Sequence, residues 1–244
     1  QLTRIGRGIA TDLDWHPNGE VIAFGGGWGV WLLDESFNEI AYFTDIPKTQ
    51  DVAWNPIESR ILATLHDDEI RVWRLTDDFT RITLDRSFPV SATEIFNGLP
   101  LDRCVIWSDD AQIVGVGTHP VRGGIASEGD SPPNARSIEY YDSATGDMMT
   151  AQNANLERQL NVRCRYGAVS PDGELETYLQ SDYLAGNSFV RVVFAPNTTA
   201  EPVADTTLSW SQVFAMDWHP SGQYITVIHH YRLINLQWDN PNES

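Results

Sequence analysis

The fold is indicated by Asp14-Trp15-His16-Pro17-Asn18-Gly19, a stretch that recurs near the other end of the chain as Asp217-Trp218-His219-Pro220-Ser221-Gly222. Weaker copies are Ala53-Trp54-Asn55-Pro56, Ile106-Trp107-Ser108-Asp109-Asp110 and Val169-Ser170-Pro171-Asp172-Gly173. Pro presets φ for the first turn position, Asn, Asp or Ser favours the turn, and Gly takes a positive φ. A short alternating segment lies on each side of every copy, so each copy predicts a β-hairpin whose residue before the turn, usually Trp, faces the core.

Further strands follow each hairpin at similar distances. Third strands are predicted at 29–34, 70–75, 138–142, 189–194 and 233–239, and more polar fourth strands at 39–43, 80–84, 148–149 and 206–208. Four short strands per repeat, without a long helical period, are typical of a β-propeller blade. Asn153 to Leu160 could form one or two helical turns.

The spacing of the repeats predicts five blades. The residues after Trp218 are too few for a complete blade, and residues 1–6 would supply its missing outer strand. Such pairing closes the ring and removes an open sheet edge. The chain is therefore predicted to be one all-β propeller domain over 1–244, with blades at about 7–45, 46–88, 99–155, 160–209 and 210–244 plus 1–6.

The turn Ser170-Pro171-Asp172-Gly173 and the segment from Ile138 to Gly146 (Ile-Glu-Tyr-Tyr-Asp-Ser-Ala-Thr-Gly) resemble the WD-repeat family. The opening Ile5-Gly6-Arg7-Gly8, followed by 29–34, resembles the first blade of bacterial members. The repeats are degenerate, because the Gly-His dipeptide of the family is absent. The resemblance implies a β-propeller that acts as a non-enzymatic protein-protein interaction or assembly scaffold.

The charge of the chain restricts its partners. Lys and Arg total 16 against 34 Asp and Glu, which gives a formal net charge of −18. Binding to nucleic acid or to an anionic membrane surface requires a basic face, so neither is expected. No apolar stretch is long enough for membrane insertion. We expect protein partners with a basic surface, possible self-assembly or membership of a larger complex, and an extracellular or cell-surface location rather than a cytoplasmic one.

Enzyme motifs are missing from the sequence, and we expect no catalytic residues, no metal and no cofactor. His16 and His219 recur at equivalent turns, which favours a structural role. Asp14 and Asp217 recur on predicted innermost strands, and their recurrence likewise favours structure over catalysis. His229-His230 cannot chelate a metal alone because adjacent strand residues point to opposite sides.

Partner binding is predicted at one face of the ring, in the loops 25–29, 66–69, 118–136, 181–188 and 229–232. The candidate contact residues are aromatic, charged or imidazole side chains in these loops: Trp28, Asp67, Asp68, Arg122, Tyr183, His229, His230, Tyr231 and Arg232. Aromatic and arginine side chains dominate the energies of many interfaces. The alternative function is that of an extracellular carbohydrate-binding or glycoside-cleaving five-bladed propeller, which would need paired carboxylates at the central channel.

The only cysteines, Cys104 and Cys164, precede the innermost strands of the third and fourth predicted blades. Their offsets from Trp107 and Val169 place them on the same side of a strand. The sequence leaves two alternatives open, a disulfide that links the two blades or two separate buried thiols.

Overall fold

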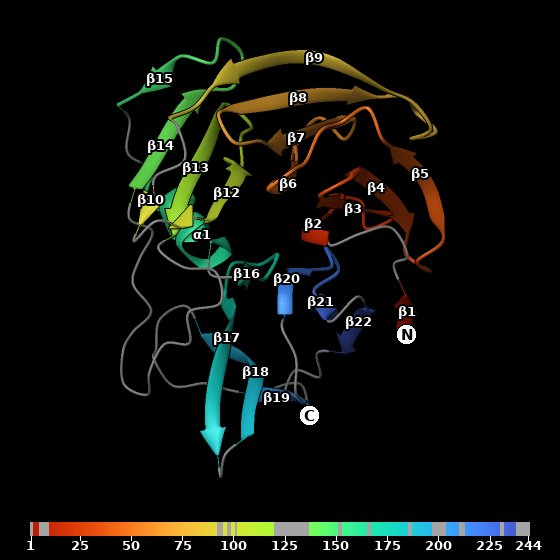
Figure 1. Cartoon of the computed structure of the whole chain (residues 1–244), viewed down its shortest axis with the longest axis vertical. Helices are drawn as coiled ribbons and strands as arrows, with labels where there is room; N and C mark the ends of the chain where they lie inside the picture. Colours follow the sequence, from red (N-terminus) through yellow and green to blue (C-terminus); the bar gives the residue numbers. More distant parts are fainter. Residues whose placement is uncertain are drawn as a thin grey trace.

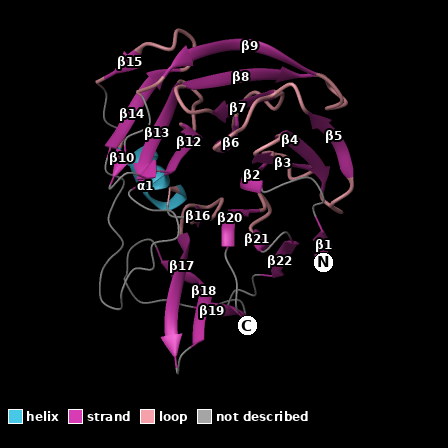
Figure 2. Cartoon of the chain, in the orientation of Figure 1, coloured by secondary structure: helices cyan, strands magenta, loops and turns pink. Residues whose placement is uncertain are grey.

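The structure is a computed structural model, and it contains five four-stranded antiparallel sheets arranged around a centre (Figures 1 and 2). It describes residues 2–4, 10–91, 95–96, 99–100, 102–119, 137–150, 153–164, 167–184, 187–196, 204–209, 213–229 and 232–237. The predicted all-β propeller of five blades is confirmed.

Each blade is a meander whose first strand lies innermost. The first blade consists of β2 (Ala10–Trp15), β3 (Val21–Gly26), β4 (Gly29–Asp34) and β5 (Glu39–Phe43). The second consists of β6 (Asp51–Trp54), β7 (Ile61–Leu65), β8 (Glu69–Leu75) and β9 (Ile82–Pro89). The third consists of β12 (Asp102–Trp107), β13 (Ile113–His119), β14 (Ser137–Asp142) and β15 (Met148–Met149). A separate hairpin precedes it, formed by β10 (Ile95–Phe96) and β11 (Leu99–Pro100).

The fourth blade consists of β16 (Ala168–Val169), β17 (Leu175–Leu184), β18 (Asn187–Pro196) and β19 (Ala204–Ser209). The fifth consists of β20 (Val213–Trp218), β21 (Tyr224–His229), β22 (Arg232–Gln237) and β1 (Leu2–Arg4). Strand β1 pairs antiparallel with β22, with Leu2 opposite Ile234 and Arg4 opposite Arg232. The predicted closure of the ring by the N-terminal strand is therefore confirmed.

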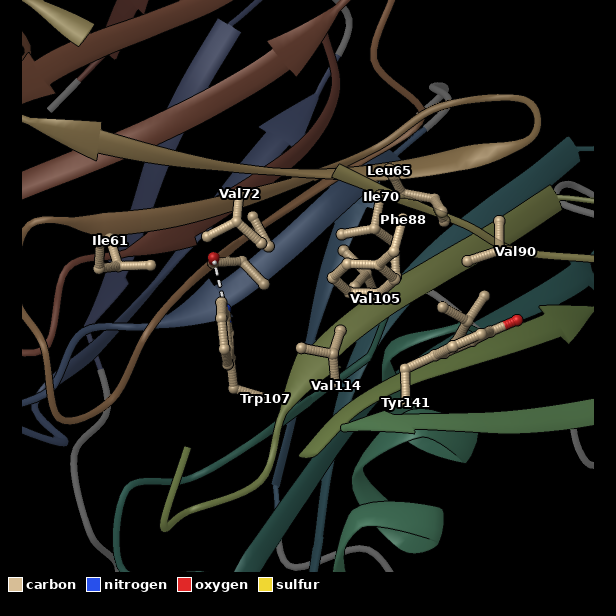
Figure 3. Packing of buried hydrophobic residues seen from close by; sticks show 13 residues of the cluster. Ile61, Leu65, Ile70, Val72, Phe88, Val90, Val105, Trp107, Val114 and Tyr141 are labelled. Atoms are coloured by element: carbon tan, nitrogen blue, oxygen red, sulfur yellow. Dashed lines mark hydrogen bonds between the residues drawn. The ribbon is translucent and has the colours of Figure 1, made fainter. Parts of the chain in front are cut away.

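The hydrophobic core lies between neighbouring blades. Figure 3 shows the seam between the second and third blades, where Ile70 and Phe88 face Val105 and Tyr141. The indole Nε1 of Trp107 donates to the Ala53 carbonyl oxygen at 3.1 Å and so joins the two innermost strands across this seam. The tryptophans before the hairpin turns, Trp15, Trp54, Trp107 and Trp218, are buried and pack against the preceding blade, which confirms that they face the core.

The seam between the third and fourth blades is built differently. Helix α1 (Ala154–Arg163) contacts β12 and β13 on one side and β16 and β17 on the other (Figure 1). Its buried Leu156 and Leu160 pack with Tyr140 and Cys104 of the third blade. The helix is longer than the one or two turns expected, because Asn153 caps its first turn by accepting from Leu156 N and because one side of it is buried.

Cys104 and Cys164 form a disulfide that fixes the end of α1 to β12. Both cysteines are buried, and a Cβ at Gly117 would lie 2.6 Å from the Cys164 sulfur. Glycine at position 117 therefore makes room for the disulfide. None of the described helices is long and apolar enough to cross a membrane.

We expect the double variant C104A/C164A to lose about 2–4 kcal/mol of unfolding free energy, because the disulfide closes a loop between residues 60 positions apart. Urea unfolding followed by tryptophan fluorescence measures this loss. The wild-type protein in reductant is the control and should unfold close to the variant. Equal midpoints for the variant and the oxidised wild type would contradict the prediction.

Candidate functional site

The innermost strands carry aspartates that hydrogen-bond to the next blade around the ring. Asp217 in the fifth blade accepts from the backbone amide of Trp15 in the first blade at 2.8 Å. Asp14 in the first blade accepts from the amide of Trp54 in the second at 2.5 Å. An innermost strand is an edge strand, so the amides that face the channel have no ladder partner and need another acceptor.

A second row of the same contacts lies two residues earlier in the repeat. Asp12 accepts from the amide of Val52 at 3.3 Å, and Asp51 accepts from the amide of Val105 at 3.0 Å. Asp12 and Asp51 each precede their turn tryptophan by three residues, and Cys104 has the same offset from Trp107. The disulfide thus occupies, in the third blade, the repeat position that the aspartates occupy in the first two.

Arg163, the last residue of α1, joins these carboxylates at the centre. Its Nη2 atom donates to Asp12 at 2.7 Å and to Asp51 at 3.3 Å, and its Nη1 donates to Asp14 at 3.0 Å. Nη2 also contacts the carbonyl oxygens of Leu13 and Val52. The Arg163 side chain is only 11% exposed, and the Asp51 side chain is fully buried. One guanidinium therefore binds both rows of acids in the first two blades.

Four carboxyl groups surround this one cation, and the excess of negative charge favours a proton on one of them. The side chains of Asp14 and Asp217 hydrogen-bond to each other, which requires a proton on one of them. Burial, and then the charge of Asp14, raises the pKa of Asp217 well above its ordinary value. Burial likewise raises the pKa of Asp14, against the opposing effect of Arg163. The pair therefore holds a proton at the seam between the fifth and first blades.

Sequence reasoning found Asp14 and Asp217 but missed Asp12, Asp51 and Arg163. A signal for the two missed aspartates exists, since they share one offset from Trp15 and Trp54. Arg163 has no comparable signal, because it has no counterpart in the other repeats and reaches residues more than a hundred positions away.

The recurring histidines bridge neighbouring turns. The Nε2 atom of His16 lies 2.6 Å from the carbonyl oxygen of Ser59 in the second blade. His219 Nε2 lies 3.0 Å from the carbonyl oxygen of Gly19 in the first blade. A Cβ at Gly19, where φ is +77°, would approach the His219 ring to 2.6 Å. These contacts support the structural role that recurrence at a turn suggested.

Three of the predicted contact residues have described side-chain surroundings. Trp28 lies in the turn between β3 and β4 and is 68% exposed. Asp67 and Asp68 lie in the turn between β7 and β8 and are also exposed. All three lie at the end of the ring that carries the turns between the second and third strands of each blade, which we call the front face.

The remaining predicted contact residues can be placed only in part. The described strands include Tyr183 in β17, His229 in β21 and Arg232 in β22, while their side chains lie outside the description. Arg122, His230 and Tyr231 lie outside the described residues altogether. The predicted set as a whole therefore stays a prediction.

The turn that holds Trp28 is supported from the neighbouring strand. The Tyr42 hydroxyl donates to the carbonyl oxygen of Trp28 at 2.9 Å, and the Tyr42 ring stacks on Trp31 at a centroid distance of 4.9 Å. Gly29, with φ +120°, follows Trp28, and a Cβ there would collide with the carbonyl of Phe43. The indole is thus exposed on a turn whose backbone is fixed.

The neighbouring turn is fixed by a buried arginine. Arg103 in β12 is 3% exposed and donates to the carbonyl oxygen of Asp67 at 3.1 Å. Asp68 accepts through its carbonyl oxygen from the amide of Val90 at 3.0 Å. The backbone of this turn therefore contacts the third blade, while both side chains are exposed and the Asp67 carboxylate accepts from Gln50 Nε2 at 2.9 Å. Among the described residues, no group of three or more His, Cys, Asp or Glu side chains could hold a metal ion.

Comparison with known proteins agrees with the fold. No family model matches the sequence, and no curated protein matches it. Among solved structures, the chain is similar to the crystal structure of the Cps50 (Swd1) β-propeller domain of Myceliophteria thermophila, with a TM-score of 0.58. The two are 14% identical, and the match covers 97% of this chain and 98% of that one. At this identity the likeness shows a β-propeller, and membership of the WD-repeat family stays a prediction.

We expect Arg163→Met to lose about 3–5 kcal/mol of unfolding free energy at pH 8, because it leaves buried carboxylates without their cation. Without Arg163 the folded-state pKa values of these carboxyls rise. Groups with raised folded pKa values favour folding at low pH, so the loss should shrink towards pH 5. Arg158→Met is the control, because Arg158 lies on the same helix and makes a partly exposed ion pair with Glu176 of β17, and it should lose less than about 1 kcal/mol. A loss of unfolding free energy that is the same at pH 5 and pH 8 would contradict the role of Arg163 as the cation of these carboxylates.

Asp217→Asn tests the proton at the seam. Since the folded pKa of Asp217 is raised, its stabilising contribution is fully present below the unfolded pKa and is lost as pH rises through the folded pKa. Asn keeps an acceptor for the Trp15 amide and donates to Asp14 at every pH. The variant should therefore be at least as stable as the wild type at pH 8. The expected gain in unfolding free energy is roughly 1 kcal/mol for each unit of pKa shift that the substitution removes. Thermal unfolding at pH 5 and pH 8 measures this, and a variant less stable than wild type at pH 8 would refute it.

Proposed function

We propose that this protein is a non-enzymatic protein-interaction scaffold of the WD-repeat type that binds partners through its front face. The observation that carries the proposal is Trp28, a large aromatic side chain that is 68% exposed on a turn held by Tyr42 and Gly29. An exposed aromatic on a rigid backbone loses little conformational entropy on binding and offers a large contact area.

The arrangement of the centre also supports binding at the faces. The central carboxyls of Asp12, Asp14, Asp51 and Asp217 accept from backbone amides of neighbouring blades, and three of them bind Arg163. A glycosidase places its two carboxyls about 5–9.5 Å apart on either side of the sugar bond. Asp14 and Asp217 hydrogen-bond to each other and accept from the Trp54 and Trp15 amides, so both carboxyls already have partners within the protein.

The partner that we propose for the front face is a protein segment with an apolar anchor and a basic flank. Trp28 would take the anchor, and Asp67 and Asp68 in the next blade would face the basic group. Arg122, Tyr183, His229, His230, Tyr231 and Arg232 complete the proposed contact set around the ring.

A displayed library of random 12-residue peptides, selected on the immobilised wild-type protein, provides the test. We expect the selected peptides to bind Trp28→Ala at least tenfold more weakly, because tryptophans that become buried in an interface are frequent hot spots of binding energy. Leu84→Ala is the matched control, since Leu84 is 51% exposed on the outer strand β9, and it should bind like wild type. Selected peptides that bind both variants as they bind wild type would place the binding surface elsewhere.

A further inference from the structure

A closed circuit of contacts joins the disulfide to the centre of the ring. Cys164 directly follows Arg163 in the sequence, and its disulfide partner Cys104 directly precedes Val105. The Val105 amide donates to Asp51 at 3.0 Å, and Asp51 in turn accepts from Arg163 at 3.3 Å. The disulfide therefore completes a circuit that runs from β12 through Asp51 to the end of α1 and back to β12.

The backbones of the two cysteines differ in how firmly they are held. Cys104 lies within β12, where it is opposite Gly117 of β13, and the two strands pair over six residues. Cys164 is the C-cap of α1, and its amide donates back to the Leu160 carbonyl oxygen. Helix ends fray, whereas strands inside a sheet open only with the core around them. Cleavage of the disulfide would therefore free the end of α1 rather than β12.

The space around the two sulfurs is already filled. Both cysteines are buried, and Leu160 packs against them. A Cβ at Gly117 would lie 2.6 Å from the Cys164 sulfur and 3.2 Å from the Cys104 sulfur. Sulfur atoms that are not bonded to each other need more space than a bonded pair, and a packed interior does not supply it. Two thiols therefore fit here only if the end of α1 moves.

Movement of the end of α1 changes the surroundings of Arg163. The guanidinium bonds to Asp12 at 2.7 Å and to Asp14 at 3.0 Å, and hydrogen bonds of this kind weaken steeply when their geometry changes. The carboxyl groups whose charges act on Arg163 come from three strands, and they are Asp12 and Asp14 in β2, Asp51 in β6 and Asp217 in β20. Withdrawal of the cation raises the pKa values of the carboxyl groups that it faces, so they bind protons more readily.

We infer that the disulfide is a redox-sensitive switch for the centre of the ring, in which reduction by a dithiol frees the end of α1 and withdraws Arg163 from the central carboxylates. In this step the sulfur–sulfur bond breaks and each sulfur gains one electron and one proton. The dithiol loses two electrons and two protons and becomes a disulfide. The switch lies in the interior of the ring, so it goes beyond the proposed function and is independent of binding at the front face.

Urea unfolding of the oxidised and the reduced wild-type chain at pH 5 and pH 7 tests the switch. The thiols stay protonated at both pH values, because an ordinary cysteine titrates near pH 8.5. Carboxyl groups with raised folded pKa values favour folding at low pH, and this contribution is lost as the pH rises through the folded pKa. We expect the urea midpoint of the reduced chain to lie below that of the oxidised chain, with a difference at pH 7 at least about twofold larger than at pH 5.

Arg163→Met is the comparison in the same experiment. This variant lacks the cation in both redox states, so its difference in midpoint between the oxidised and reduced chains should be the same at pH 5 and pH 7. A wild-type difference that does not change with pH would show that the disulfide acts only by constraining the unfolded chain, and would overturn the inference. A difference that changes with pH equally in the wild type and in Arg163→Met would also overturn it.

The rate of reduction of the folded, oxidised chain gives a second measurement, which does not require the reduced chain to stay folded. Dithiothreitol can reach the buried sulfurs only when the end of α1 opens, so the bonds of Arg163 protect the disulfide. Alkylation followed by mass spectrometry measures the rate at pH 7. We expect Arg163→Met to be reduced at least about tenfold faster than wild type. Arg163→Lys keeps the positive charge and should be reduced more slowly than Arg163→Met.

Leu62→Ala is the control for a general loss of stability. Leu62 is buried in the cluster between the first and second blades, so its truncation destabilises the ring without removing a contact of Arg163. Its disulfide should be reduced at less than half the rate found for Arg163→Met. Equal rates in the two variants would show that reduction follows global unfolding, and would overturn the inference. A rate for Arg163→Met equal to that of wild type would overturn it as well.

Discussion

The structure depends on how the channel-facing amides of the innermost strands find acceptors. A closed ring leaves one edge of every blade facing the centre, where ladder pairing ends and water is largely excluded. Asp217, Asp14, Asp12 and Asp51 provide those acceptors from the neighbouring blade. Charged acceptors form strong hydrogen bonds with amides, but their burial brings negative charges together. The positive charge of Arg163 offsets part of this repulsion between carboxylates, and the proton shared by Asp14 and Asp217 offsets more of it.

Helix α1 makes this compensation possible. Its last residue, Arg163, contacts the first and second blades, and the next residue, Cys164, is bonded to the third. Its body fills the space between the third and fourth blades (Figure 1). One short helix therefore connects four of the five sheets. The fifth is joined to the first by Asp217, by the bond from Trp15 Nε1 to Thr226, and by the pairing of β1 with β22.

The repeat could be predicted from the sequence because its determinants are local. Pro17, Gly19 and their equivalents set turns within a few residues, and alternating segments set the strands around them. Closure by β1 followed from counting strands. The partners of the central acids could not be predicted, because Arg163 meets Asp12 across 151 positions and lies in a helix that belongs to no repeat. The cysteine alternatives stayed open for the same reason, since the path of α1 decides the distance between Cys104 and Cys164.

The chemistry at the centre determines where binding is possible. The acids there are already bound to amides and to a cation, so a ligand could reach them only by displacing bonds that hold neighbouring blades together. Many side chains of the turns do not hold blades together. The backbones of the turns are fixed by local hydrogen bonds, so these exposed side chains can contact a partner. Contact through Trp28 would depend mainly on apolar area, which salt affects little, whereas contact of a basic group with Asp67 and Asp68 would depend on charge, which salt screens within about 10 Å at 0.1 M. A ring with a rigid, occupied centre can therefore present, on one face, two kinds of contact that respond differently to ionic conditions.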